Sequence, residues 1–137
     1  MNNEFASYQA LAMRTAKPME LQDDLLHAAL GLSGEAGEFA DCIKKHWAYK
    51  QPLDTSNALE ELGDLLWYIA LACNALDVDM GRVAAMNIDK LRRRYPTAYQ
   101  DELAAFRADK QQEIAAWARP AECQSSKPFP ALPLALP

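Results

Sequence analysis

The sequence predicts an all-α protein. Glycine is scarce, with five among 137 residues, and no stretch alternates apolar and polar residues as a half-buried strand does. Apolar side chains instead recur at helical spacing through most of the chain. Half of the residues are hydrophobic and 24% are charged, which is typical of a globular protein with one core.

Prolines and turn residues divide the chain into expected helices. Pro18 ends the first, Tyr95-Pro96 ends the fourth, Ser56 or Asn57 is the expected cap of the third, and Asp79 caps the fourth. The expected spans are residues 5–16, 21–49, 58–76, 80–94 and, less amphipathic, 99–118. We therefore expect one helical domain over residues 1–118, with its core at about 5–96.

The end of the chain has a different composition. Residues 119–137 contain five of the eight prolines. Such a segment is expected to be a disordered tail, and a proline-rich docking peptide is the functional alternative.

Charge and cysteine content narrow the function. The net charge of −5 disfavours a nucleic-acid binder, yet it is compatible with a nucleotide enzyme that uses metal ions. The three cysteines form no C-x-x-C pair, and Cys42 and Cys73 are expected to be small core residues. No signal peptide or membrane-spanning run is visible, so a cytoplasmic location is expected.

Two acidic pairs are the most informative feature. Glu35 and Glu38 are three residues apart on the second expected helix, and Glu61 and Asp64 are three apart on the third. This spacing places both carboxylates of a pair on one side of a helix. If the two helices pack antiparallel through a short loop, four carboxylates converge.

Glu61 is expected within an apolar sector of its helix. It is in line with Leu65, Tyr68 and Ala72, whereas Glu60 faces elsewhere. The expected core stripe of this helix comprises Leu59, Leu62, Leu66, Ile69, Cys73 and Leu76. The expected stripe of the preceding helix comprises Leu32, Ala36, Phe39 and Ile43.

Carboxylates beside a core require compensation. Such a carboxylate lowers the free energy of unfolding by several kcal/mol, on the order of the penalty for an unpaired buried ion, unless a cation is near. All-oxygen ligation favours Mg²⁺, with Mn²⁺ as an alternative. Two rival interpretations are a solvated acidic face neutralised by Lys44 and Lys45, and a di-iron bundle. The di-iron bundle is disfavoured because neither His27 nor His46 stands three residues after a candidate glutamate.

The chain resembles the short, single-domain MazG-like branch of the all-alpha NTP pyrophosphatases. The resemblance covers roughly Tyr8 to Pro96, and its motifs are Gly-Leu-Ser-Gly-Glu-Ala-Gly-Glu at 31–38, Ile-Lys-Lys at 43–45, the acidic segment 60–68 and Asn-Ile-Asp-Lys-Leu-Arg-Arg-Arg-Tyr-Pro at 87–96. It implies a four-helix core that forms a homodimer or homotetramer. It also implies hydrolysis of an NTP or dNTP between the α and β phosphates, giving a nucleoside monophosphate and pyrophosphate.

The resemblance assigns roles to individual residues. The metal ligands would be Glu35, Glu38, Glu61 and Asp64. The longer MazG proteins carry a further glutamate at the position of Gly34, so a fifth ligand is in doubt, and Asp41 is a weak substitute.

The catalytic residues are expected to be Glu38 and Glu61, with Glu38 the candidate for orienting the attacking water. Lys90 and Arg94 are expected to contact phosphates, and Asn87 to hydrogen-bond the substrate or a carboxylate. Lys45 is a weaker phosphate candidate. Trp47 and Tyr68 are either core residues or stack on the base, and Tyr68 is included among the substrate-binding residues.

The sequence therefore leaves two functions open. The first is a magnesium-dependent pyrophosphohydrolase that cleanses the nucleotide pool. The alternative is a non-catalytic helical interaction or nucleotide-sensing protein.

Overall fold

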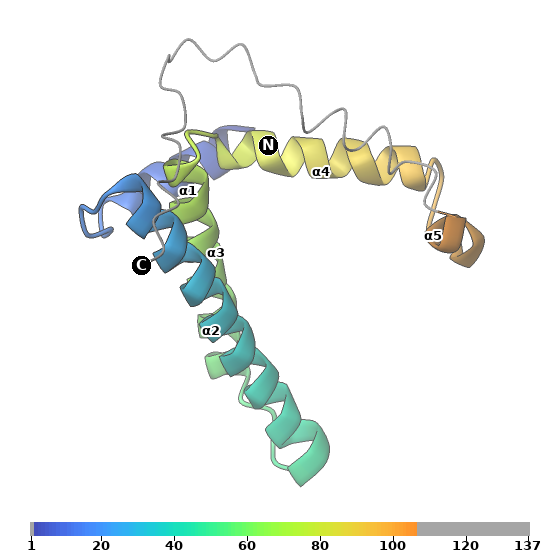
Figure 1. Ribbon diagram of the computed structural model, residues 1–137. Helices are drawn as coiled ribbons and strands as arrows, with labels where there is room; N and C mark the ends of the chain where they lie inside the picture. Colours follow the sequence, from blue (N-terminus) through green and yellow to red (C-terminus); the bar gives the residue numbers. More distant parts are fainter. Residues whose placement is uncertain (1, 107–137) are drawn as a thin grey trace, which may run out of the picture. The chain divides into compact units, whose positions relative to one another are not determined.

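A computed structural model describes residues 2–106 of the chain. The described part is all-helical and contains no strand, as the sequence predicts (Figure 1). Its helices are α1 (Asn2–Met13), α2 (Leu21–Tyr49), α3 (Thr55–Ala75), α4 (Met80–Arg94) and α5 (Asp101–Phe106).

The chain divides into two units, Met1–Asp89 and Lys90–Pro137, and each is described by itself. The first unit contains α1, α2, α3 and the first part of α4. The second contains the end of α4 and α5, where the rings of Tyr95 and Tyr99 lie 5.4 Å apart and the Tyr99 hydroxyl donates to Asp101.

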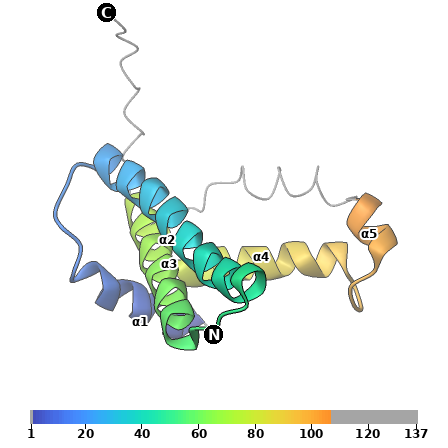
Figure 2. The same cartoon turned by 90° about the horizontal axis from the view of Figure 1, so that it is seen from below.

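The α2–α3 hairpin is the main element of the first unit. The two helices run antiparallel and side by side in both ribbon views (Figures 1 and 2). Lys50 ends α2 in the left-handed backbone region with φ of 56°, and the Asp54 side chain caps α3 by accepting from the Asn57 N–H. The Cys42 thiol donates to the Asp54 carbonyl, which ties the loop to α2.

Helix α1 packs against α3 through small side chains. Ala12, Ala70, Cys73 and Met80 form a buried cluster in which Ala70 is fully enclosed. Gln9 joins α1 to the turn between α3 and α4, because its amide nitrogen donates to the Val78 carbonyl and its amide oxygen accepts from the Met80 N–H. These two bonds satisfy backbone groups that the turn leaves without helical partners.

Three predicted features of the helices are confirmed. Helices α2 and α4 have the predicted bounds. Asp79 caps α4 by accepting from the Arg82 N–H. Cys42 and Cys73 are buried.

The bounds of α1 and α3 differ from the prediction. Helix α1 begins at Asn2 and ends at Met13, because residues 14–16 form a turn in which the Thr15 hydroxyl bonds the Ala12 carbonyl. Helix α3 is capped by Asp54, not by Ser56 or Asn57. The run 54–57 offers four capping residues, and the first one takes the role.

The predicted core stripe of α3 is wrong for the single chain. Only Cys73 among its six members is buried, and the leucines Leu59, Leu62, Leu66 and Leu76 are between 41% and 63% exposed. In the stripe predicted for α2, Ala36 and Ile43 are exposed while Leu32 and Phe39 are half-buried. The physical reason is that α3 turns the side with Ala58, Glu61 and Leu65 toward α2. The opposite side, with Leu59, Leu62 and Leu66, is left uncovered.

Part of the prediction lies outside the described residues. The fifth helix is described only as Asp101–Phe106, so its predicted extension to residue 118 is not covered. The predicted tail at 119–137 and Cys123 also lie beyond the described part. Among the described helices, none combines the length and the apolarity that crossing a membrane requires.

The close approach of α2 and α3 at Gly31 generates a stability prediction. A methyl group at Gly31 would overlap the Tyr68 ring, which is held by edge contacts with His27 and Trp67. We expect Gly31→Ala to lower the free energy of unfolding by about 1–3 kcal/mol, the usual effect of overpacking, in urea denaturation.

The control for this prediction is Gly34→Ala, one turn along the same helix. A methyl at Gly34 would meet no atom within 4 Å. Gly34→Ala should therefore gain about 0.5–1 kcal/mol from helix propensity. Equal effects at the two glycines would contradict the packing described here.

Candidate metal centre

Three carboxylates meet between α2 and α3. One oxygen from each of Glu35, Glu38 and Glu61 lies within 4.8 Å of the other two. Glu35 and Glu38 are one turn apart on α2, and Glu61 comes from the facing side of α3. From the spacing of the two acidic pairs the sequence predicted that four carboxylates would converge, and the structure gathers three of them.

Glu61 is the most enclosed member of this carboxylate cluster. It is 6% exposed and is the one buried charged residue among those described, whereas Glu35 is half-buried and Glu38 is exposed. Burial raises the pKa of the Glu61 carboxyl above its usual value, and the nearby charge of Glu38 and a hydrogen bond with Glu35 raise it further. The pKa shift therefore records like charges gathered in a poorly solvated place.

Asp64 lies beside the cluster and is not one of its three members. It is exposed, and its charge makes a small contribution to the raised pKa of Glu61. Asp64 also lies near Tyr8 of α1. Burial raises the pKa of the Tyr8 hydroxyl, and the charge of Asp64 raises it further. Asp64 thus borders the cluster on the side of α1.

The neighbouring lysines do not neutralise the cluster. Lys44 and Lys45 both form salt bridges with Asp41, and the Lys45 Nζ lies 2.8 Å from its oxygen. Hydrogen bonds from these two lysines lower the pKa of Asp41 to about 2. Asp41 is therefore engaged as their counter-ion and not as a supplementary member of the carboxylate cluster.

An aromatic group adjoins the cluster on the side toward the start of α2. The Tyr68 ring lies over Gly31, one turn before Glu35. It makes edge contacts with His27 at 5.5 Å and with Trp67 at 5.0 Å between ring centroids. The Trp67 indole N–H donates to the Thr15 hydroxyl, which fixes the ring.

Sequence reasoning identified Tyr68 but missed its two aromatic neighbours. The sequence carries a signal for Tyr68, which stands seven residues after Glu61 and so lies on the same side of α3. The glycine at position 31 provides the space for the ring. In the sequence, His27 figures only in the argument against a di-iron bundle, and its contact with Tyr68 becomes visible only when α2 and α3 are paired.

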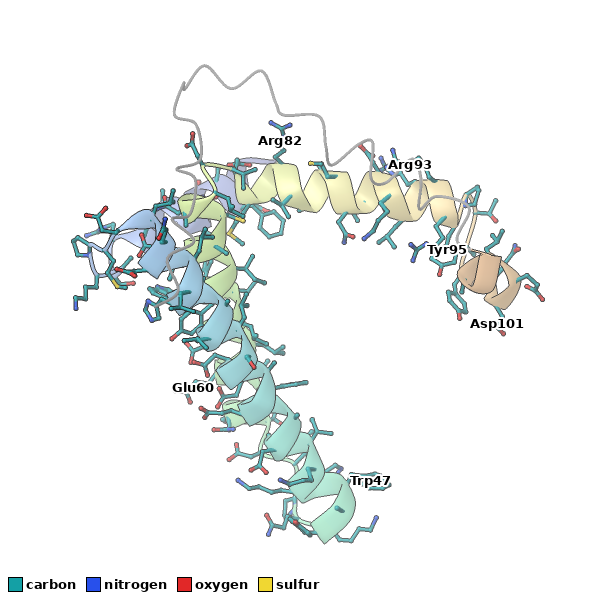
Figure 3. The ribbon with its side chains drawn as sticks, in the orientation of Figure 1. Trp47, Glu60, Arg82, Arg93, Tyr95 and Asp101 are labelled. Atoms are coloured by element: carbon teal, nitrogen blue, oxygen red, sulfur yellow. The ribbon has the colours of Figure 1, made fainter. Side chains whose placement is uncertain are left out.

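Trp47 and Glu60 are not members of the carboxylate cluster. Trp47 is 74% exposed near the closed end of the hairpin, and Glu60 is exposed at its side (Figure 3). Asn87 is exposed on α4 within the first unit. Lys90 and Arg94 belong to the second unit, so their predicted contact with phosphates stays a prediction.

The α2–α3 hairpin with its carboxylate cluster places this chain among all-helical proteins with an acidic centre between two helices. Residues 24–99 match the MazG nucleotide pyrophosphohydrolase domain family, which is more than half of the chain. The chain belongs to this family.

Two further comparisons frame this assignment. The chain is 38% identical over 76 residues to the Gene 37 protein of Mycobacterium phage L5, a match that covers 53% of this chain and 67% of the phage protein. No solved structure matches the chain.

The burial of Glu61 predicts how stability depends on pH. Its pKa in the folded protein is raised above 4.5, so between that value and the folded pKa the folded state binds more protons than the unfolded state. The metal-free protein should therefore lose stability as the pH rises through this window. Glu61→Gln lacks this loss, so its melting temperature should gain on that of the wild type as the pH rises above 4.5.

Glu60→Gln is the matched control, since Glu60 is exposed on the same helix. The difference in melting temperature between Glu60→Gln and the wild type should stay constant over the same range. A Glu61→Gln protein that parallels the wild type at every pH would show that Glu61 is solvated.

Proposed function

We propose that this protein is a magnesium-dependent nucleoside triphosphate pyrophosphohydrolase. It would cleave an NTP or dNTP between the α and β phosphates and so serve to cleanse the nucleotide pool. The observation that carries the proposal is the carboxylate cluster of Glu35, Glu38 and Glu61. The nearby Lys44 and Lys45 pair with Asp41 and not with this cluster. Membership of the family supports the reaction class.

The cluster suits a hard divalent cation. It offers carboxylate oxygens alone, and the like charges that raise the pKa of Glu61 are what a cation would offset. We assign Glu35, Glu38 and Glu61 as ligands of Mg²⁺, or of Mn²⁺, with Asp64 completing the set from the side. A bound cation would draw the negatively charged phosphates into an acidic site and lower the pKa of a coordinated water.

The chain's own residues then direct the hydrolysis. Water adds to the α phosphorus, the bond from that phosphorus to the bridging oxygen breaks, and pyrophosphate leaves. Glu38 is the exposed member of the cluster and therefore the one best placed to accept a proton from water. Glu61, held between the helices, fixes the position of the cluster and serves with Glu38 as a catalytic residue.

Residues outside the cluster are assigned to the substrate. Lys90 and Arg94 are proposed to contact phosphates, and Asn87 to hydrogen-bond the substrate or a carboxylate. Lys45 is a weaker candidate, because it already pairs with Asp41. Tyr68 is proposed to lie against the nucleobase, since its ring adjoins the cluster.

A non-catalytic interaction or nucleotide-sensing protein is the alternative. Such a protein would have no need to enclose Glu61 among other carboxylates, because this arrangement destabilises the fold in the absence of a cation. Pyrophosphate release from each NTP and dNTP in the presence of Mg²⁺ distinguishes the two functions. Absence of turnover on every triphosphate by the folded protein would exclude the enzyme.

Adjacent glutamates provide the sharpest mutational test of the site. Glu61→Gln should lower kcat by about 100-fold or more, the range seen when a group that positions a reactive water is removed. Glu60→Gln should leave kcat nearly unchanged, because Glu60 points to solvent. If Glu60→Gln were the more damaging of the two, the assignment of the site would be wrong.

We further propose that two copies associate through the exposed leucines of α3. The stripe of Leu59, Leu62, Leu66 and Ile69 runs along one side of the helix and is 37–63% exposed. Monomeric proteins rarely leave a contiguous stripe of this kind in water, and a two-fold axis would pair it with itself. The carboxylate cluster lies on another side of α3, so such pairing would leave it accessible.

The association is tested with a charge in the stripe. Leu66→Glu should reduce the mass measured by light scattering toward that of one 15.3 kDa chain, because pairing would bury the two introduced glutamate side chains. Leu11→Glu, at a 60% exposed leucine of α1, should not change the mass. A wild-type protein that is monomeric at every concentration would contradict the proposal.

A further inference from the structure

The first unit contains a cavity at the open end of the hairpin. It has a volume of about 340 Å³ and lies between α1 and the turn that joins α3 to α4. The residues that line it are Ala6, Gln9, Ala10, Met13, Asn74, Asp77, Val78 and Asp79. Half of these residues are apolar, two are carboxylates, and none is a lysine or an arginine. The volume is at the lower end of the range of ligand pockets, so the cavity can take up one large apolar side chain with a cation beside it.

The closed end of the hairpin presents a group of this kind. Trp47 is 74% exposed, more than any other large hydrophobic residue that the structure describes (Figure 3). It stands four residues after Ile43 and so continues the apolar stripe of α2. The Lys50 Nζ lies 5.8 Å from the centre of the Trp47 ring and donates to the Trp47 carbonyl, which keeps a cation beside the indole. Tryptophans that fill a pocket of the partner are common anchors of protein–protein interfaces.

Trp47 cannot reach the cavity of its own chain. The cavity lies at the end of α3, whereas Trp47 lies beside the start of this helix. The 21 residues of α3 span about 31 Å, which is several times the length of a tryptophan side chain. A second copy of the chain, however, carries both the cavity and the tryptophan.

The symmetry of the proposed leucine pairing brings the two features together. The stripe from Leu59 to Ile69 has its middle at residue 64, nine residues after the first residue of α3 and eleven before the last. A two-fold axis that crosses α3 there at a right angle exchanges the ends of the helix, which are roughly 14 and 17 Å from the axis. The closed end of each hairpin then lies against the open end of the other.

We propose that Trp47 of one copy inserts into the cavity of a second copy, and that Lys50 beside it pairs with Asp77 of that copy. The two-fold axis makes the same contact a second time. Asp77 is better suited than Asp79, whose carboxylate already caps α4. The inference rests on the proposed association through α3 and deepens it, since it assigns the anchor residues and the orientation of the pair.

The test measures the dissociation constant of the dimer by sedimentation equilibrium of the full chain. Trp47→Ala removes the anchor, and Ala10→Phe fills the cavity. Either homodimer lacks both contacts, so its dissociation constant should rise about 100-fold, or about 10-fold for each lost anchor. Two controls should leave the constant nearly unchanged. Tyr49→Ala alters a 63% exposed aromatic residue at the same end, and Leu11→Phe adds a ring to α1 outside the cavity.

Mixing the two variants separates a lost contact from a folding defect. In a mixed dimer, Trp47 of the Ala10→Phe copy meets the open cavity of the Trp47→Ala copy, so one of the two contacts is restored. The mixed dimer should therefore form about 10-fold more tightly than either variant homodimer. Misfolded variants would show no such gain.

The ion pair is tested by a double-mutant cycle. Lys50→Gln and Asp77→Asn should each weaken the dimer, and the double variant should be no weaker than either single one, because both substitutions remove the same interaction. Asparagine is a suitable replacement at position 77, since it tolerates the left-handed backbone with φ of 52°.

The outcomes distinguish this inference from the pairing on which it rests. A wild-type protein that is monomeric would remove the pairing and the anchor together. Dimers of Trp47→Ala and Ala10→Phe as tight as those of the wild type, with Leu66→Glu monomeric, would keep the pairing and overturn the inference. Absence of a gain in the mixed dimer would also overturn it.

Discussion

The structure depends on one unfavourable contact, the meeting of Glu61 with Glu35 and Glu38 between two packed helices. Their oxygens approach within 4.8 Å, and Glu61 is 6% exposed. Among the described residues, the adjacent Lys44 and Lys45 pair with Asp41, so these two lysines do not relieve the repulsion. A fold that keeps such a contact is less stable than one with an apolar residue at position 61, and cation binding is the interaction that would reverse this.

The hairpin separates two kinds of surface on α3. Glu61 and Tyr68 share the side that faces α2, where small residues such as Gly31 and Ala58 allow close approach. The side with Leu66 is apolar and uncovered. One helix can thus position a polar centre and also offer an association surface, because helical periodicity keeps the two sides apart. The acidic centre and the proposed pairing surface can therefore change independently.

Sequence periodicity predicted the fold class, the bounds of α2 and α4 and the enclosure of Glu61, because these depend on spacing within one helix. It failed where the answer depends on a neighbour. The α3 leucines read as core, although one chain alone does not cover them.

The central claim is that the three carboxylates are a cation site, and diffraction from crystals grown with Mn²⁺ tests it most directly. The account predicts an anomalous peak in contact with Glu35, Glu38 and Glu61 at millimolar Mn²⁺, and none at that position in Glu61→Gln. Glutamate side chains that turn into solvent, with no peak between α2 and α3, would contradict the account.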